Sequence, residues 1–479
     1  MKKTVVVVGG GISGLTAAYV LAKKGYDIVL IEKSDSVGGL AKTFSHKGYL
    51  LDYGPHNFHT GLPRVLSFVR NELAITLNRI KISSSKLYFM GRIVDYPLKI
   101  ADAIKILDPV TASLCFYDYL ITRLSARLGL RSSKEDSFEA WIVNRFGRRL
   151  YNLYFGPYVK KVWGIPGTEL NVTVAKQRIP EPSLFALLFR VVTGVRIFKK
   201  HTEDPSTVES YYPPMGIGVI SEKLAEGIRS MGGRIELNSS ALEIKRGAAK
   251  TIQYSKGGEK LEQKWDYIIN TVPLNTFCSM IRDGEAGAAV KESIEKCGYR
   301  SLVLLYMFLK IERVFDSPWV YFNDRDNTDL IFNRVYEVGG FSKEMISGGK
   351  GAVCLEITCR KGDELWNTSD EGIFDKCIEY FEKRGYLKRD QVEEYITVHL
   401  DDVYPVFKVG YIKHVENLMN YIMKNDDMFS IGRQGLFAYA NMDHCIDMGL
   451  RLERLFRDDN SAGKAEYFSL FNDYVKTEK

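Results

Sequence analysis

The sequence predicts an α/β fold that opens with a strand, a helix and a second strand and continues with helices and an antiparallel sheet. The first observation is the β-branched run at residues 5–8, which is typical of a strand buried on both faces. A glycine-rich turn, a helical pattern at 15–24 and an apolar run at 27–31 complete the opening unit. The second observation is a set of segments with the alternation of antiparallel strands, namely residues 301–311, 330–338 and 352–358.

The other segments alternate between helical and strand patterns. Helices are predicted within residues 99–128, 138–161, 216–231 and 432–450, and strands at 234–245 and 264–272. Residues 204–212 are polar and are expected to cross between domains. Because 479 residues are too many for one small core, we expect two interleaved domains.

The composition is that of an ordinary globular enzyme, with 45% hydrophobic and 26% charged residues. The net charge of +7 is a mild excess, which fits an anionic small substrate or a negative membrane surface and excludes a nucleic-acid footprint. The seven cysteines form no CxxC pair, and we expect Cys354 and Cys359 to be strand residues. A reduced, cytoplasmic location is the default expectation, with no metal site.

No segment predicts a membrane-spanning helix or a secretory signal. The apolar run at 5–8 leads directly into glycines, unlike a signal peptide. The most apolar later segment, residues 183–198, is interrupted by Arg190 and Arg196 and is shorter than a spanning helix. We expect an amphipathic surface or core helix there, with peripheral membrane contact as the alternative.

The turn after the first strand carries a GxGxxG motif in the context that binds a dinucleotide. Gly9 permits the tight turn, Gly11 lets backbone N–H groups approach a pyrophosphate, and Gly14 lets the helix pack against the strand. Ile12 and Ser13 then open a helix whose N-terminus attracts phosphate. 

Glu32 follows the second strand, where a carboxylate accepts hydrogen bonds from both ribose hydroxyls. Since it would repel a 2′-phosphate, NADP is not expected. After Glu32 and Lys33, residues 37–43 hold a second glycine pair, Gly38 and Gly39, followed by Leu40. This extension resembles the FAD-binding signature of the amine oxidase and glutathione-reductase-like flavoproteins, and it implies a Rossmann-type FAD-binding domain.

Two histidines follow in the segment at residues 52–60. His56 and His59 lack a carboxylate or third histidine at metal-ligand spacing, which argues against a metal pair. The segment resembles the GPHxFHT signature of UDP-galactopyranose mutase, whose histidines lie beside the flavin isoalloxazine.

Further segments resemble the same family in the same order. Residues 158–164 resemble GYxxKQWG, which implies that Trp163 contacts uridine. Arg178 resembles the arginine of a mobile loop that closes over the diphosphate. Residues 333–337 resemble TRIxE and place Arg334 near flavin and substrate, and residues 404–406 resemble YYP, with Tyr404 donating to a phosphate oxygen.

The last match is residues 432–443, which resemble GRLxxYxYxDMD. There Arg433 and Tyr439 are implied to bind the diphosphate, while the following helix points its N-terminus at the flavin. Arg178 and Arg433 could together clamp a diphosphate, because their forked donors suit phosphate oxygens. The resemblance implies an FAD site with the following residues: Gly9, Gly11, Ile12, Ser13, Gly14, Glu32, Lys33, Gly39, Leu40, His56, Leu242, Gly432, Asn441 and Met442.

The chain departs from the mutase pattern at several positions. Residues 338–341 replace a basic HKHF, and Phe437 and Asn441 replace a tyrosine and an aspartate. Relative to the mutases, residues 181–210 are expected to be an insertion. The tyrosine that mutases carry after the mobile-loop arginine has no clear counterpart, and Tyr211 and Tyr212 are only nearby candidates.

The resemblance implies an isomerase that interconverts pyranose and furanose forms of a UDP-linked sugar in cell-surface polysaccharide biosynthesis. It implies reduced FAD, whose N5 attacks the anomeric carbon to form a flavin–sugar adduct while UDP departs and returns. His56, His59 and Arg334 are the expected catalytic residues, and a homo-oligomer is expected. The alternatives are an oxidase or desaturase of the protoporphyrinogen oxidase or amine oxidase type, and a flavin-bound module without catalysis.

The domain boundaries are expected to be discontinuous. The predicted FAD-binding domain comprises residues 1–90, 205–275 and 415–479, and the predicted substrate domain comprises residues 91–204 and 276–414.

Overall fold

The computed structural model describes most of the chain. The described residues are 2–80, 85–96, 106–130, 135–179, 209–247, 250–282, 286–323, 329–424, 427–456 and 463–475. The apolar segment 183–198 and most of the predicted insertion at 181–210 lie outside these residues. Among the described residues, no helix is long and apolar enough to cross a membrane.

A five-stranded parallel sheet forms the first half of the molecule. Its order is β10 (Arg234–Glu236), β2 (Asp27–Ile31), β1 (Thr4–Val8), β14 (Tyr267–Asn270) and β21 (Met428–Ser430). Val5, Val6 and Val7 are fully buried, as expected for a central strand covered on both faces. The sheet confirms the predicted α/β fold, and its strands come from distant parts of the chain.

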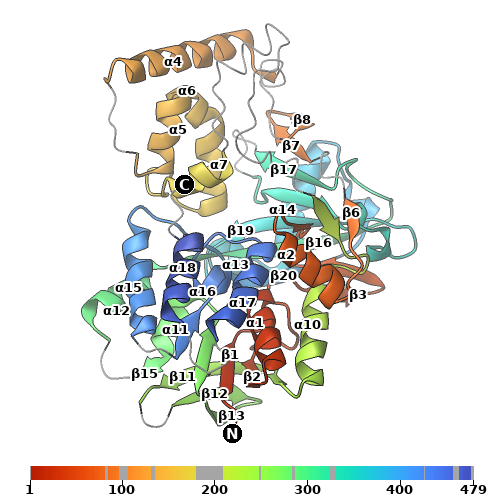
Figure 1. Ribbon diagram of the computed structural model, residues 1–479. Helices are drawn as coiled ribbons and strands as arrows, with labels where there is room; N and C mark the ends of the chain where they lie inside the picture. Colours follow the sequence, from red (N-terminus) through yellow and green to blue (C-terminus); the bar gives the residue numbers. More distant parts are fainter. Residues whose placement is uncertain are drawn as a thin grey trace.

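Helices cover this sheet. Helix α1 (Ile12–Lys23) follows β1 and packs against α10 (Val219–Ser230) and α17 (Met442–Leu455). Figure 1 shows α1 and α17 side by side above the end of β1. α1 is therefore covered along most of its length, and even its small and polar residues Ser13, Thr16 and Ala17 are buried.

A seven-stranded sheet forms the second half. Its order is β20 (Val392–Pro405), β16 (Tyr299–Leu309), β19 (Ala352–Cys359), β18 (Arg334–Glu337), β17 (Trp319–Asn323), β7 (Lys86–Phe89) and β8 (Arg92–Asp95). All neighbours are antiparallel except the β17–β7 pair, which is parallel. 

Both faces of this sheet are buried. Along β16, Val303 and Leu305 point into a core shared with helix α14 (Asp370–Lys383), while Leu304 and Tyr306 point to the opposite face, toward Tyr212. The predicted strands at 301–311 and 352–358 are confirmed, as is the placement of Cys354 and Cys359 on a strand. The strand predicted at 330–338 is observed only over the residues of β18. β20, the longest strand among the described residues, was not predicted.

The smaller elements complete the fold. A four-stranded sheet contains β13 (Glu259–Lys264), β12 (Thr251–Lys256), β11 (Ser239–Lys245) and β15 (Ile281–Arg282). The other two sheets pair β3 (Thr43–His46) with β4 (Tyr49–Asp52), and β5 (Phe58–His59) with β9 (Ser210–Tyr212) and β6 (Asn78–Ile80).

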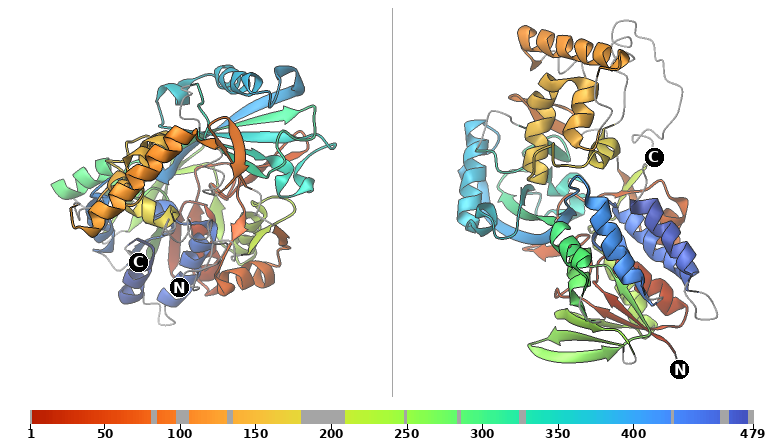
Figure 2. Two further views of the ribbon diagram at one scale, coloured as in Figure 1. Left: turned by 90° about the horizontal axis from the view of Figure 1, so that it is seen from above. Right: turned by 90° about the vertical axis from the view of Figure 1, so that its left-hand side faces the viewer.

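A helical unit projects from the two main sheets. It contains α4 (Pro109–Arg127), α5 (Phe138–Phe146), α6 (Arg148–Leu150), the π-helical turn Tyr151–Phe155 and α7 (Gly156–Trp163). Figures 1 and 2 show α4 at the end of the molecule opposite the N-terminus. The domain boundaries stay a prediction, and β7, which lies within predicted segment 1–90, pairs in the seven-stranded sheet.

Candidate cofactor and substrate site

Two cavities are lined by most of the predicted site residues, and one of them, of about 420 Å³, lies where the strands of the parallel sheet end. Gly9 follows β1, Glu32 follows β2 and Thr271 follows β14, and all three line this cavity. The carboxyl ends of parallel strands are the usual place for a ligand in such sheets. We call this space the first cavity.

The glycines of the GxGxxG motif have different physical reasons to be glycine. A Cβ atom at Gly14 would overlap the carbonyl oxygen of Gly9, so only glycine lets α1 pack this close to β1. Gly11 lines the first cavity, and a Cβ atom there would meet nothing within 4 Å. Since φ at Gly11 is −72°, the chain itself does not require glycine here, and the added atom would project into space that a ligand can use.

Glu32 is buried and already holds the surrounding backbone. One carboxylate oxygen accepts the Gly10 N–H at 2.6 Å, and the other accepts the Ser34 N–H at 2.8 Å. A carboxylate has about four acceptor positions, so two remain for ligand hydroxyls. Lys33 lines the same end of the cavity.

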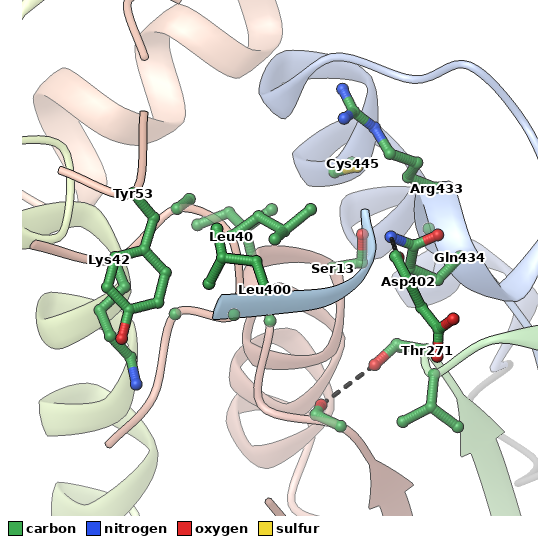
Figure 3. Close-up of a pocket in the computed structure, with 18 of the residues that line it drawn as sticks. Ser13, Leu40, Lys42, Tyr53, Thr271, Leu400, Asp402, Arg433, Gln434 and Cys445 are labelled. Carbon is green, nitrogen blue, oxygen red and sulfur yellow. Dashed lines mark hydrogen bonds between the residues drawn. The ribbon is translucent and has the colours of Figure 1, made fainter. Parts of the chain in front are cut away.

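The start of helix α1 faces the middle of the first cavity. Figure 3 shows Ser13 between the apolar side chains of Leu40 and Leu400 on one side and Arg433 and Gln434 on the other. Gly432 has φ of +84°, and a Cβ atom there would lie 2.6 Å from the Ser13 hydroxyl oxygen. The glycine is therefore needed for the close approach between α1 and the segment after β21.

Gln434 carries an acceptor without a protein partner. Its Nε2 donates to the carbonyl oxygens of Asp402 and Val403, while its Oε1 is buried and has no hydrogen-bond partner within the described parts of the chain. Because buried polar atoms are nearly always paired, an acceptor of this kind at a cavity wall fits a donor supplied by a ligand.

His56 lines the first cavity as a neutral imidazole. Burial, and next the Arg433 guanidinium, lower the pKa of His56 to about 4. Its Nδ1 lies 3.1 Å from the Gly54 carbonyl oxygen. Since a carbonyl can only accept, Nδ1 carries the proton and Nε2 is left as an acceptor.

His59 occupies a different place. Its Nδ1 lies 2.9 Å from the Ser210 hydroxyl, on the pair formed by β5 and β9. Burial lowers its pKa as well. His59 is absent from the described linings of both cavities, so the structure does not bring the two histidines together.

A smaller second cavity, of about 220 Å³, lies beside the seven-stranded sheet. Its wall combines aromatic and polar side chains: Tyr96, Tyr158, Val162, Trp163, Tyr321, Asn333, Arg334, Glu356, Thr358, Tyr404 and Tyr439. Asn333 is 7% exposed, and its Oδ1 has no hydrogen-bond partner among the described residues. The second cavity therefore also offers an unused acceptor.

Arg334 in this cavity is paired with a residue that the sequence did not single out. Its Nε and one terminal nitrogen each donate to a Glu356 oxygen at 2.7 Å. The two residues are register partners on β18 and β19. Burial by itself would lower the pKa of Arg334, but the adjacent Glu356 carboxylate and other nearby groups outweigh it and keep the pKa well above its ordinary value, so the pair is ionic.

Arg433 connects the two cavities. It lines the first cavity, and its guanidinium carbon lies 5.7 Å from the Tyr404 ring centroid and 5.5 Å from that of Tyr439, both of which line the second. Its Nε donates to the Ala440 carbonyl oxygen at 2.7 Å. Trp163 lies beside this group, 6.5 Å from Tyr404 between ring centroids.

Most predicted site residues line one of the two cavities. In the first are Gly9, Gly11, Ile12, Ser13, Glu32, Lys33, Gly39, Leu40, His56, Gly432, Arg433 and Met442, and in the second are Trp163, Arg334, Tyr404 and Tyr439. Gly14 supports the first cavity from behind. Asn441 caps α17 without lining either cavity, and Leu242 is 38% exposed on β11, away from both linings. Arg178 ends helix α8 (Thr173–Arg178), and its side chain lies outside the described part of the structure.

Several lining residues were not predicted. In the first cavity they include Lys42, Tyr53, Thr271, Asp402 and Gln434, and in the second Asn333 and Glu356. Thr271 could have been found, because it lies near the carboxyl end of the strand predicted at residues 264–272. Glu356 could not, because its position opposite Arg334 depends on the register of two strands. The described residues contain no cluster of three or more side chains suited to a metal ion.

Comparison with known proteins agrees with this geometry. Residues 7–71 match the family model of the NAD(P)-binding Rossmann-like domain. A protein of Klebsiella pneumoniae named "Probable UDP-galactopyranose mutase" is 27% identical over 186 residues, 37% of this chain and 45% of the relative. A 1-hydroxycarotenoid 3,4-desaturase of Flavobacterium is 25% identical over 262 residues, 51% of each chain. The chain thus matches only about half the length of these relatives.

A solved structure covers much more of the chain. The crystal structure of a reduced UDP-galactopyranose mutase superposes with a TM-score of 0.79 at 20% identity, over 95% of this chain and 93% of the other. This agreement shows the fold. The resemblance first seen in the motifs is therefore confirmed: the chain is similar in sequence and in fold to UDP-galactopyranose mutases, and it carries a Rossmann-like dinucleotide-binding unit.

Proposed function

We propose that this chain is an FAD-dependent enzyme that interconverts the pyranose and furanose forms of a UDP-linked sugar. The observation that carries the proposal is the position of Arg433, which lines the dinucleotide-type cavity and lies against two tyrosines of the second cavity. A guanidinium at this junction suits a diphosphate held beside a flavin. As part of the same proposal, the enzyme is cytoplasmic and serves cell-surface polysaccharide biosynthesis.

The first cavity fits FAD on three grounds. The open space above Gly11 and the start of α1 suit a pyrophosphate. The free acceptor positions of Glu32 suit ribose hydroxyls. Gln434 Oε1 has no hydrogen-bond partner among the described residues and could accept a hydrogen bond from the ligand. When bound in its reduced form, FAD supplies a nucleophile for the anomeric carbon of the sugar. The protein then needs no nucleophile of its own.

Arg433 of the first cavity and two residues of the second cavity would hold the nucleotide. Arg433 and Tyr404 would bind the diphosphate, with Trp163 against the uracil. Burial raises the pKa of Tyr404, so its hydroxyl stays protonated and can donate. Holding the departed UDP in place lets it recombine with the sugar, an effect of proximity. We propose that Arg178 adds a second guanidinium.

His56 and Arg334 would orient the reacting groups. Because His56 is neutral, its Nε2 can accept a hydrogen bond from the flavin or the sugar without adding charge. Arg334 is held by Glu356, so its direction is set before substrate arrives. We assign neither residue a proton transfer.

The second candidate is an FAD-dependent oxidase or desaturase with an apolar substrate. The similarity to a carotenoid desaturase over half of this chain favours it. The ionic Arg334–Glu356 pair and the unpaired Asn333 acceptor in the second cavity favour the mutase, because an apolar substrate would leave both groups unsolvated.

The test is to supply the purified protein with UDP-galactopyranose, with and without dithionite, and to separate the products by anion-exchange chromatography. We expect the furanose form only with reduced flavin and no oxygen consumption. Oxygen consumption with an apolar donor, with no ring interconversion across a panel of UDP-sugars, would instead support the oxidase.

A matched pair of variants tests the role of Arg433. Arg433→Ala is expected to weaken UDP binding about tenfold or more while flavin absorbance is retained, because a lost charged hydrogen bond costs about 1.5–3 kcal/mol. Arg360→Ala, an exposed arginine outside both described cavity linings, is the control. Equal UDP affinity in both variants would remove the diphosphate assignment.

A further inference from the structure

Helix α4 and the few residues after it carry more than half of the large apolar side chains that are exposed on the described part of the chain. Sixteen large apolar side chains are classed as exposed there, and nine of them lie between residues 110 and 130. They are Val110, Leu114, Phe116, Tyr117, Leu120, Ile121, Leu124, Leu128 and Leu130. Tyr117 and Leu124, two turns apart on one face of the helix, are 63% and 59% exposed.

The opposite side of α4 already has its partner. Tyr119 and Thr122 are buried, and α4 packs against α5 and α6. Asp118 points to this inner side, where its carboxylate accepts the Arg149 N–H at 2.8 Å. α4 is therefore anchored by one face, and its apolar outer face stays exposed among the described residues. Figures 1 and 2 show this helix at one end of the molecule.

The outer face is wider than the seam of a two-helix coiled coil. At 100° per residue, the exposed apolar side chains of α4 from Phe116 to Leu114 span roughly 160° of the helix. A two-helix coiled coil uses a narrower stripe of two residues in seven. A broad apolar face that includes aromatic rings is typical of a helix lying in a membrane interface.

On helix α4 itself, the charged side chains beside this face are both basic. Arg123 and Arg127 are exposed along its edge. Two acids lie nearby: Asp108, the N-cap of α4, accepts the Thr111 N–H, and Asp118 on the helix accepts the Arg149 N–H. The excess of 66 basic over 59 acidic residues in the chain acts in the same direction.

We propose that the outer face of α4 is a docking surface for anionic lipid bilayers. The leucines and rings enter the boundary between headgroups and acyl chains, and Arg123 and Arg127 contact lipid phosphates. The helical unit that carries α4 also supplies Tyr158 and Trp163 to the second cavity. The proposal does not depend on the function proposed for the cavities.

Vesicle sedimentation of the full-length, flavin-loaded protein tests the proposal. We expect binding to phosphatidylcholine vesicles that contain phosphatidylglycerol, and weaker binding to phosphatidylcholine alone. Leu124→Gln with Leu128→Gln should lower the partition coefficient about tenfold or more. Arg123→Gln with Arg127→Gln should lower it to a similar extent on the anionic vesicles and little on the neutral ones.

The control is Leu261→Gln with Phe468→Gln, two side chains that are 37% and 42% exposed elsewhere on the molecule. It should bind vesicles as the unmodified protein does. Absence of binding to anionic vesicles, or equal loss in the control, overturns the proposal. So does a dimer seen by sedimentation velocity without lipid that Leu124→Gln with Leu128→Gln dissociates, since the face would then bind a second copy.

Discussion

Arg334 and Glu356 face each other across strands β18 and β19 and share two hydrogen bonds of 2.7 Å in the wall of the second cavity. The Glu356 side chain is 4% exposed and that of Arg334 is 19% exposed. Removing one member of a buried pair leaves an uncompensated charge, whereas removing both does not.

Glu356→Gln should therefore lower the free energy of unfolding by about 3–5 kcal/mol. The double variant Glu356→Leu with Arg334→Leu should be less destabilised than Glu356→Gln alone, as measured by urea unfolding. If the double variant loses as much free energy of unfolding as the two single substitutions lose together, the pair is not coupled. UDP should bind Glu356→Gln more tightly than the unmodified protein, since the Arg334 charge is then available to an anion.

Gly11 and Gly14 should respond differently to alanine. Gly11→Ala adds an atom to open space, so the melting temperature of the flavin-free protein should stay unchanged while flavin affinity falls about tenfold or more. Gly14→Ala forces α1 away from β1 and should destabilise the flavin-free protein itself, because the new atom overlaps the Gly9 carbonyl oxygen.

The measurements are thermal unfolding of the flavin-free proteins and fluorescence titration with FAD. Gly298→Ala serves as the control, because a Cβ atom there also meets nothing within 4 Å and Gly298 lies outside the first-cavity lining. Unchanged FAD binding in Gly11→Ala would argue against a pyrophosphate at this position.

Asp52 and His56 should give opposite pH dependences of stability over the same range. Burial raises the pKa of Asp52 to about 6, despite hydrogen bonds from Thr43 and Tyr212. The stabilisation that Asp52 adds to the free energy of unfolding is fully present below its ordinary pKa of 3.8, and it is lost as pH rises through about 6. Burial lowers the pKa of His56 to about 4. The stabilisation that the neutral His56 adds is therefore fully present above its ordinary pKa of 6.5, and it is lost as pH falls through about 4.

Between about pH 4 and about pH 6 the two contributions of about 3 kcal/mol each oppose one another. In the flavin-free protein, Asp52→Asn should make the free energy of unfolding increase with pH, and His56→Asn should make it decrease with pH. Urea unfolding at several pH values in this range measures both slopes. Equal slopes in the two variants would contradict the assignment.

Asn333 should contribute to binding at a cost in stability. Its Oδ1 is buried without a hydrogen-bond partner among the described residues, which costs about 1–3 kcal/mol. Asn333→Leu should therefore stabilise the ligand-free protein slightly and weaken UDP-sugar binding. Asn323→Leu is the control, because the Asn323 side chain donates to the Tyr154 carbonyl oxygen and its replacement should only destabilise. If both variants are less stable than the unmodified protein, the unpaired Asn333 oxygen does not cost stability and the proposed role of Asn333 is wrong.

The sequence by itself determined the opening strand, the helix and the glycine-rich turn between them. These features are local: Gly9, Gly11 and Gly14 lie within one turn and the start of one helix, so their spacing already specifies their geometry. The same holds for the buried strands, whose apolar runs follow from the exclusion of water from the sheet.

Only the tertiary structure decided which distant residues meet. Glu356 lies 22 residues from Arg334, and strand register alone brings them together. His56 and His59 are three positions apart, yet one lines the first cavity and the other bonds to Ser210. Their separation could not be predicted, because it depends on how β9 returns from a distant part of the chain to pair with β5.

The same distinction holds on the surface. The sequence pattern shows that α4 is apolar around most of its circumference, but packing against α5 and α6 decides which of its faces is buried. A helix uses its apolar residues equally well in a core or at an interface, since burial of either side removes the same kind of surface from water. Which face of α4 is exposed could therefore be identified only from its packing against α5 and α6.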